Sequence, residues 1–184
     1  MDKLNETEVL QLIKDCVRGS RKAQHKLFKT YYGSLFTVCM RYAPCREDAE
    51  DMLNEGFVKI FTALESYQPT GSFEAWLRTI MVNTALDYLR KYRHDNEMLN
   101  YDDANDNVLK NYDENEALAK ISIDELMALI QRLPTMSRTV FNLYVFDDMP
   151  HAEIAKQLNI KEGTSHWHLN FARTKLKEAI EKQR

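Results

Sequence analysis

The sequence predicts an all-α protein made of two small helical domains joined by a flexible acidic linker. Apolar residues recur at helical spacing over most of the 184 residues, and strand-type alternation occurs nowhere. Residues 95–116 lose this periodicity and concentrate acidic side chains. The C-terminal end follows the helix-turn-helix plan of a short helix, a turn and a longer helix. These observations predict domains at residues 1–95 and 117–184, with the linker at 96–116.

Four helices are predicted in the N-terminal domain, and their expected ranges are 8–18, 21–42, 46–66 and 73–93. Thr7 is the candidate N-cap of the first helix and Ser72 that of the fourth, because each precedes a periodic apolar run. Gly19 interrupts the chain after the first helix and Pro44 after the second, since neither residue favours a helix interior.

The third predicted helix carries an apolar stripe beside an acidic one. The apolar stripe consists of Ala49, Leu53, Phe57, Ile60 and Leu64. The acidic stripe contains Asp48, Asp51 and Glu55. A stripe of this kind is either solvated surface or a docking patch for another protein, and acids in the first turns also suit the helix dipole. A metal site is disfavoured, because no histidine has the Glu-x-x-His spacing that such helical sites use.

The fourth predicted helix has one broad apolar side and one polar side. The apolar side holds Leu77, Met81, Val82, Ala85, Leu86, Tyr88, Leu89 and Tyr92. Asn83, Asp87 and Arg90 line up opposite, with Tyr67 and Trp76 near one end. Amides and guanidinium groups read base edges and phosphates, and aromatic rings stack unpaired bases. An ordinary amphipathic helix with a solvated polar side explains the same pattern. This stretch alone therefore does not distinguish a DNA-binding helix from a solvated one.

The C-terminal domain is predicted to contain four helices. An apolar stripe formed by Leu126, Leu129, Ile130 and Leu133 precedes Pro134. Ser137 is the candidate N-cap of a helix that ends at Phe146. A short helix at 151–158, a turn at 159–161 and a last helix from about residue 162 complete the helix-turn-helix plan.

The last helix also has two sides. Its inner side is predicted to contain Ser165, Leu169, Ala172, Leu176 and Ile180. The opposite side presents His166, Asn170, Arg173 and Lys177, which can hydrogen-bond bases and touch phosphates in a major groove. A solvated tail helix is the alternative. Trp167 and Phe171 are assigned either to thymine methyl contacts or to the domain core.

Composition and charge exclude several classes of protein. A mean hydropathy of −0.52 and the absence of a long apolar run argue against a membrane protein. The N-terminus lacks the layout of a secretory signal, so a cytoplasmic location is expected. The net charge of −3 is uneven, because residues 95–116 hold eight acids and one base. The three cysteines lack a C-x-x-C spacing, which favours free thiols over zinc.

No catalytic arrangement is found in the sequence. Ser, His and Asp residues are present without a nucleophile elbow, and no glycine-rich phosphate loop occurs. His166 and His168 are two residues apart and therefore point to different sides of a helix. We expect a protein that is not an enzyme and that uses neither a cofactor nor a metal.

Both halves together resemble one known family, the extracytoplasmic-function (ECF) sigma factors of the sigma-70 superfamily. In the first half the resemblance is carried by DAEDMLNEGF at residues 48–57, by SFEAWL at 72–77, and by Asn83, Asp87 and LRK at 89–91. In the second half it is carried by Leu133-Pro134, Arg138, Val140, Phe141 and Leu143, then by EIA at 153–155, Leu158 and Gly163-Thr164. These motifs cover nearly the whole chain in the family's order and spacing.

The resemblance implies a division of labour between the two domains. The N-terminal domain would be sigma region 2, which docks on RNA polymerase core and opens the minus-ten promoter element. The implied docking residues, which meet the clamp coiled coil of the largest subunit, are Asp48, Asp51, Leu53, Asn54, Glu55 and Phe57. The implied minus-ten residues are Tyr67, Trp76, Asn83, Asp87, Arg90 and Lys91, with Tyr67 and Asn83 holding an extruded base.

The C-terminal domain would be sigma region 4, which meets the polymerase flap and reads the minus-thirty-five element in duplex form. The implied DNA contacts are Thr164, His166, Trp167, His168, Asn170, Arg173 and Lys177. The acidic linker would lie in the RNA-exit channel, where it stands in for RNA phosphates. Relatives are often held inactive by an anti-sigma factor, which the resemblance implies as a further partner.

Some positions depart from the family pattern. Many relatives carry bases where His166, Trp167, His168 and Phe171 stand, Asn54 replaces a usual glutamine, and Pro150 replaces a common N-cap residue. Two other classes stay open on the residues alone. A stand-alone helix-turn-helix regulator would bind its operator without polymerase, and a sigma mimic would bind a regulator and ignore promoter DNA.

Overall fold

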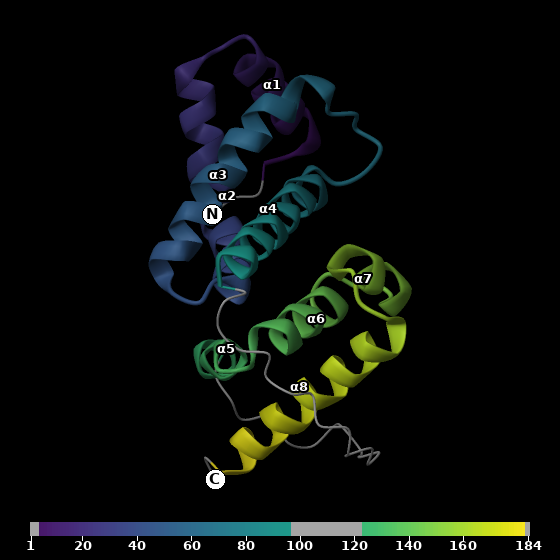
Figure 1. Ribbon diagram of the computed structural model, residues 1–184. Helices are drawn as coiled ribbons and strands as arrows, with labels where there is room; N and C mark the ends of the chain where they lie inside the picture. The colour runs from purple at the N-terminus through teal and green to yellow at the C-terminus, as the bar shows by residue number, and fades with distance from the viewer. Residues whose placement is uncertain (1–3, 97–122, 183–184) are drawn as a thin grey trace. The chain divides into compact units, whose positions relative to one another are not determined.

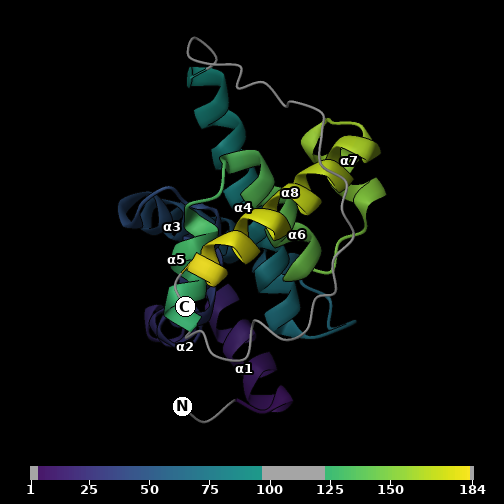
Figure 2. The same cartoon turned by 90° about the horizontal axis from the view of Figure 1, so that it is seen from below.

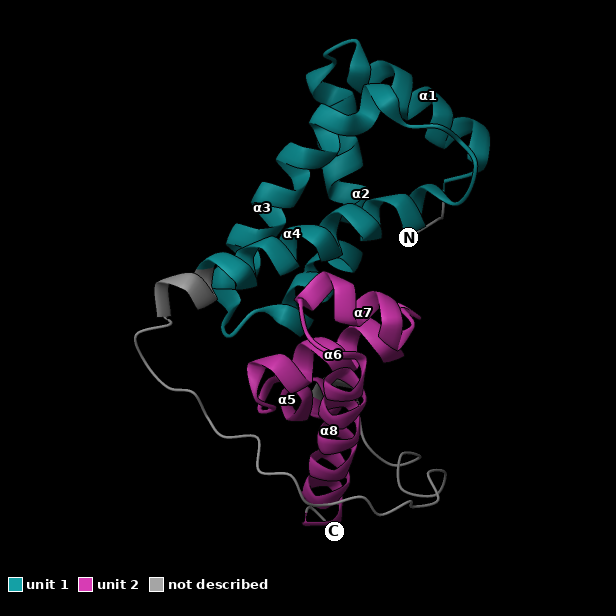
Figure 3. Cartoon of the chain, turned by 45° about the vertical axis from the view of Figure 1, so that its right-hand side comes forward, with its two compact units in different colours: residues 1–97 teal, residues 98–184 magenta. Residues whose placement is uncertain are grey.

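The computed structural model of the protein describes residues 4–96 and 123–182. Within these ranges every regular element is a helix, so the all-α prediction is confirmed. The chain divides into two compact units, Met1–Glu97 and Met98–Arg184 (Figure 3). Apart from Asn96, the predicted acidic linker lies outside the described residues.

Unit 1 contains four α-helices and one short 3-10 turn (Figure 1). They are α1 (Glu6–Val17), α2 (Arg21–Tyr42), α3 (Arg46–Ala63), the 3-10 turn η1 (Leu64–Ser66) and α4 (Phe73–Asn96). The helices α2, α3 and α4 pack on one another, and α1 covers α2 and η1. Leu27, Tyr42, Leu53, Ile60 and Met81 fill the centre of this bundle and are almost completely buried. Burying side chains of this size provides most of the stability of a small helical unit.

Two details of unit 1 differ from the sequence prediction. The N-cap of α1 is Asn5 and not Thr7: the Asn5 side chain accepts from the Glu8 N–H (2.9 Å), and the Glu8 carboxylate accepts from the Asn5 N–H (2.8 Å). This reciprocal pair is a capping box, which satisfies two otherwise unpaired donors. The third helix ends at Ala63 and tightens into η1, whereas a single helix to Ser66 was predicted.

The helices α3 and α4 approach each other closely at Gly56. A Cβ atom at this position would lie 2.5 Å from Sδ and 2.6 Å from Cε of Met81, which is itself fully buried. Both distances are far below van der Waals contact, so a side chain at position 56 would force the buried thioether of Met81 to move. The glycine is therefore explained by packing between helices and not by backbone conformation.

Unit 2 contains α5 (Ile123–Gln131), α6 (Thr135–Val145), α7 (His151–Leu158) and α8 (Glu162–Lys182). The long helix α8 packs on α5, α6 and α7 (Figures 1 and 2). Asn159 ends α7 in the left-handed conformation at φ 53°, which asparagine tolerates better than most residues. The predicted inner side of the last helix is confirmed, because Ser165, Leu169, Ala172, Leu176 and Ile180 are all buried.

The start of α6 corrects another predicted cap. Pro134 occupies the N-cap position, and Ser137 lies inside the first turn, where it is buried. Nearby, Arg138 is 3% exposed and donates to the carbonyl of Gln131, the last residue of α5, over 3.0 Å. Burial lowers the pKa of Arg138. This contact supplies a donor to the C-terminal end of α5, where helix carbonyls lack partners.

The packing at Gly56 generates a test with an internal control. Gly56→Ala is expected to lower the free energy of unfolding by about 1 kcal/mol, because overpacking against Met81 outweighs the gain in helix propensity. Gly33 also lies within a helix, but nothing stands within 4 Å of its added Cβ atom. Gly33→Ala should therefore raise the same free energy by about 0.5–1 kcal/mol. Urea unfolding followed by circular dichroism measures both, and equal gains would contradict the packing account.

Candidate nucleic-acid interface

The outer face of α3 presents part of the predicted docking set. Asp51, Asn54 and Glu55 are exposed along this face. Leu53 and Phe57, which were also predicted to dock, are 1% and 3% exposed and belong to the core beneath it. Their side chains fix the orientation of α3 from below, and a docking role for them stays a prediction.

Asp48 connects this face to α4. One carboxylate oxygen accepts from the Tyr88 hydroxyl (2.5 Å), and the other accepts from the Cys45 thiol (3.1 Å). The hydrogen bond to Asp48 raises the pKa of Tyr88 to about 12, with burial and the charge of the same carboxylate adding to the shift. A hydrogen bond to a charged acceptor is among the stronger kinds, so it helps hold the two helices in register.

A chain of ion pairs links the acidic face of α3 to the polar side of α4. Lys59 Nζ lies 2.9 Å from Glu55 Oε1 and 3.2 Å from Asp87 Oδ2. The other oxygen of Asp87 accepts from Arg90 Nη1 at 2.9 Å. These side chains are largely exposed, so the pairs add little stability. The pairs instead orient the two cations, because the Asp87 carboxylate binds Lys59 through one oxygen and Arg90 through the other.

The polar side of α4 lies where the sequence predicts it. Asn83, Asp87, Arg90 and Lys91 are exposed, and they share one helix with Trp76. The amide of Asn83 stands two turns from Trp76 on the same side of the helix. This row offers two cations, a carboxylate and an amide to a ligand in solvent.

An aromatic cluster stands at the start of α4. The Tyr67 ring lies 5.0 Å from that of Trp76 and 5.1 Å from that of Phe73, both edge to face. Phe73 also stacks on Trp76 at 5.6 Å. The Tyr67 hydroxyl donates to the Gly71 carbonyl over 3.3 Å, which closes the turn. The structure thus brings Tyr67 and Trp76 together, as predicted. It adds Phe73 to the cluster, which the sequence did not reveal because the position of this ring depends on how the turn folds.

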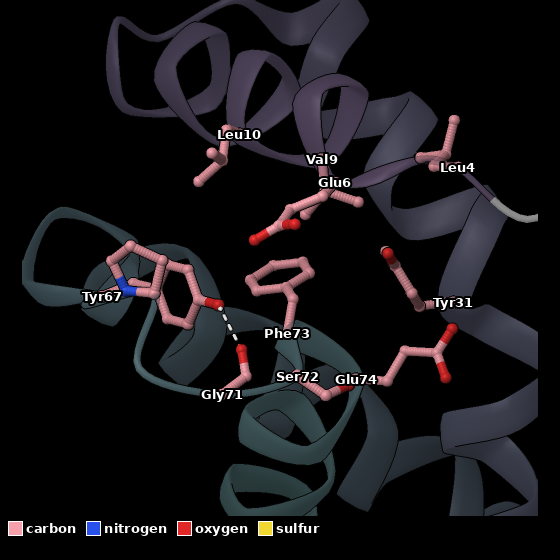
Figure 4. Close-up of a pocket in the computed structure, with 11 residues that line it drawn as sticks. Leu4, Glu6, Val9, Leu10, Tyr31, Tyr67, Gly71, Ser72, Phe73 and Glu74 are labelled. Carbon is pink, nitrogen blue, oxygen red and sulfur yellow. Dashed lines mark hydrogen bonds between the residues drawn. The ribbon is translucent and has the colours of Figure 1, made fainter.

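A pocket of about 340 Å³ lies behind this cluster, between α1 and the turn (Figure 4). Val9 and Leu10 of α1 line it on one side, and Tyr67 and Phe73 on the other. Glu6 also projects into it from α1 (Figure 4). The pocket separates the aromatic turn from the first helix, so the turn has space on one of its sides.

In unit 2, a stack of rings supports the exposed side of α8. The His151 ring lies 3.7 Å from that of His166 and 4.5 Å from that of Tyr144. His151 is buried, and its Nδ1 lies 2.8 Å from the Ser165 hydroxyl oxygen. Arg173 extends over the Tyr144 ring at 5.9 Å. His166 and Arg173 are therefore exposed but held in place from below.

The other aromatic residues of α8 divide between its two sides. His168 is half-buried, and its Nδ1 lies 2.9 Å from Ser137 Oγ of α6, so this nitrogen is engaged within unit 2 and a DNA contact by His168 stays a prediction. Trp167 and Phe171 stack on each other with centroids 5.2 Å apart, and both are half-buried. The exposed residues of the predicted set are His166, Asn170 and Arg173, whereas Thr164 and Lys177 are half-buried.

The described ranges lack two features that are typical of other classes of protein. No helix there is long and apolar enough to cross a membrane. Among the described side chains, no three His, Cys, Asp or Glu residues are grouped so as to hold a metal ion. The described cysteines Cys16, Cys39 and Cys45 are free thiols.

Two family models match the chain. Sigma-70 region 2 matches residues 27–94, and Sigma-70, region 4 matches residues 123–176, which together cover about two thirds of the sequence. The chain is 26% identical to the RNA polymerase sigma-H factor of Pseudomonas aeruginosa, over 97% of this chain and 96% of that protein. It is 27% identical to the ECF RNA polymerase sigma factor SigW of Bacillus subtilis, over 97% of both.

A solved structure supports the fold. The sigma factor RpoE of Bartonella quintana, crystallised with the anti-sigma factor NepR, matches with a TM-score of 0.52 at 16% identity. The match covers 87% of this chain and 98% of that one.

A region 2 bundle followed by a region 4 helix-turn-helix unit defines the sigma-70 class of transcription initiation proteins. The chain belongs to this family, within the extracytoplasmic-function subfamily, and is an RNA polymerase sigma factor. A stand-alone helix-turn-helix regulator does not account for the match to region 2.

The buried histidines of unit 2 generate a prediction on pH. Burial lowers the pKa of His151, with His166 and Arg173 adding to the shift and Glu162 opposing it, and burial also lowers the pKa of His168. Their folded-state pKa values lie below the unfolded value of about 6.5. The unfolded chain therefore binds more protons as the pH falls through this value, and unit 2 should lose stability between about pH 7 and pH 5.

The measurement uses Trp167 as the only tryptophan, in a Trp76→Phe background. The denaturation midpoint of Trp167 fluorescence should fall on acidification, and His151→Gln should reduce that fall. His25, which is exposed in unit 1, provides the control variant His25→Gln. If acidification shifts the midpoints of the parent and His151→Gln equally, the buried histidine is not the cause.

Proposed function

We propose that unit 1 docks on RNA polymerase core through the outer face of α3 and opens the minus-ten element with the polar side of α4. The observation that carries this proposal is the placement of both surfaces on one closely packed helix pair. Asp51, Asn54 and Glu55 would meet the clamp coiled coil of the largest subunit. Asp48 contributes by holding α3 against Tyr88 of α4.

The opening step needs no hydrolysis. Unpairing and extruding one base costs a few kcal/mol, least at A·T-rich steps, and contacts to the extruded base must offset this cost. Stacking on Tyr67 and Trp76 and hydrogen bonds to the Asn83 amide supply such contacts. Arg90 and Lys91 would contact the backbone, with Asp87 orienting Arg90 through the 2.9 Å pair. The protein acts as a specificity subunit and not as a catalyst.

Unit 2 would read the minus-thirty-five element and meet the polymerase flap. His166, Asn170 and Arg173 are exposed on one side of α8, which is the helix that enters the major groove in helix-turn-helix proteins. Thr164 and Lys177 lie at the edges of this side, and Trp167 with Phe171 forms a half-buried apolar border that can contact thymine methyl groups.

The organisation around the two units follows from the same proposal. We place the functional domains at residues 1–95 and 117–184, with residues 96–116 as an acidic connector. RNA polymerase core and promoter DNA are cytoplasmic, so the chain would act in the cytoplasm. An anti-sigma factor is a further proposed partner, supported by the RpoE–NepR complex from Bartonella quintana.

The role of Asn83 can be separated from docking. Asn83→Ala should leave core binding unchanged and reduce run-off transcription by about 5-fold to 100-fold, because a bidentate amide–base pair contributes about 1–3 kcal/mol. Thr79→Ala on the same helix, where the hydroxyl only bonds the Ala75 carbonyl, serves as the matched control. Run-off transcription with saturating core polymerase measures the effect. Equal transcript yields from both variants would remove Asn83 from base recognition.

A further inference from the structure

Exposed cations gather on α1 and α2, two helices that hold none of the residues assigned above. The sequence contains no acid between Asp15 and Glu47, although the whole chain carries a net charge of −3. Six exposed cations make up this set, which we name the basic track: Lys14, Arg18, Arg21, Lys22, Lys26 and Lys29. Three of them, Lys22, Lys26 and Lys29, share one side of α2, since they are spaced by four and three residues.

The cations of the basic track differ in their pairing from other cations of unit 1 that the structure describes. Elsewhere in the unit, Lys59, Arg46 and Arg90 each pair with a carboxylate. Within the described ranges, no carboxylate forms an ion pair with any of the six cations of the track. Six exposed positive charges that pair with no described carboxylate are a surface that attracts a polyanion.

The basic track is continuous with the aromatic turn. A cavity of about 430 Å³ is lined by Lys14 and Arg18 of α1 and, on its opposite side, by Tyr67 and Pro69 of the turn. Glu65 is the one acidic residue among its described lining. Beyond Arg18 the track crosses the turn at Gly19 and continues on α2. A DNA strand bound at Tyr67 would therefore have the cations of the basic track beside its neighbouring phosphates.

The composition of the track favours DNA phosphates over a protein surface. Protein interfaces have an apolar centre and are depleted in lysine, whereas α2 exposes no large apolar side chain and the α1 part of the track exposes one, Val17. The Phe28 ring of α2 packs on other rings: its centroid lies 5.4 Å from that of Tyr32 on the same helix and 4.5 Å from that of Phe57 on α3. Single-stranded DNA needs free rings for stacking, whereas duplex phosphates need only cations. Lys22 and Lys29 lie about 10 Å apart along the helix, a length that faces several phosphates.

We propose that the basic track binds the phosphate backbone of duplex promoter DNA next to the opened element. This proposal rests on the assignment of Tyr67 and α4 to the minus-ten element. It adds a second, sequence-independent contact to the one that α4 makes, on the side of the aromatic turn that faces Lys14 and Arg18. The contact would strengthen binding to every promoter equally and would not change which promoter is chosen.

The test measures promoter binding by the holoenzyme at several salt concentrations. Each phosphate contact contributes about 0.9 to the slope of log affinity against log salt, so Lys22→Gln/Lys29→Gln should reduce this slope by about 2. The matched control is Arg132→Gln/Lys182→Gln, which removes the same charge from exposed positions of unit 2 that are not assigned to DNA. Between about 50 and 200 mM salt, the parent and the control should lose about tenfold more affinity than the α2 variant.

The outcomes separate this inference from the proposed function. If the parent holoenzyme initiates at promoters but the α2 variant keeps the parent slope, the inference is wrong and the proposed function stands. Weaker core binding by the α2 variant at an unchanged slope would place a protein on this surface instead of DNA. A slope change seen only with single-stranded non-template DNA would overturn the duplex assignment. If the parent itself fails to initiate, the proposed function fails first.

Discussion

The packing of α3 against α4 at Gly56 is the constraint on which unit 1 depends. Because the Met81 side chain of α4 fills the space that a side chain at position 56 would take, the two helices interlock there, and the acidic face of one keeps a fixed relation to the polar side of the other. Tyr88 and Asp48 hold the same pair together by a hydrogen bond, and Lys59 bridges its surfaces through Glu55 and Asp87. Docking on polymerase would therefore also fix the orientation of the groups that meet DNA.

In unit 2, hydrogen bonds between helices fix the exposed side of α8. Two hydrogen-bonded contacts, Ser165 with His151 and Ser137 with His168, tie α8 to the helices α6 and α7. They set the rotation of α8 about its own axis, so that His166, Asn170 and Arg173 face solvent.

Features set by apolar periodicity were predicted correctly, whereas the choice of some capping residues and the direction of some side chains were not. The bounds of α2 and α7 and the inner side of α8 follow from apolar periodicity and from nearby breakers, which single sequences reveal. The capping residue of α1 was wrong because Asn5 and Thr7 both fit the local pattern, and only the Glu8 contact distinguishes them. The inward direction of His168 depends on Ser137, which lies 31 residues away in sequence. The basic track was not predicted either, because recognising it requires knowing which cations have a carboxylate nearby in the folded chain.

The central claim is that one helix pair both docks on polymerase and presents the groups that open a promoter. Its most direct test mixes the purified chain with RNA polymerase core and compares it with Asp51→Lys/Glu55→Lys, measuring complex formation and run-off transcription on a promoter library. The account predicts a specific complex and defined transcripts for the parent chain, and loss of both for the charge-reversed variant. Failure of the parent chain to form a complex, or a complex that initiates at no promoter, would contradict it.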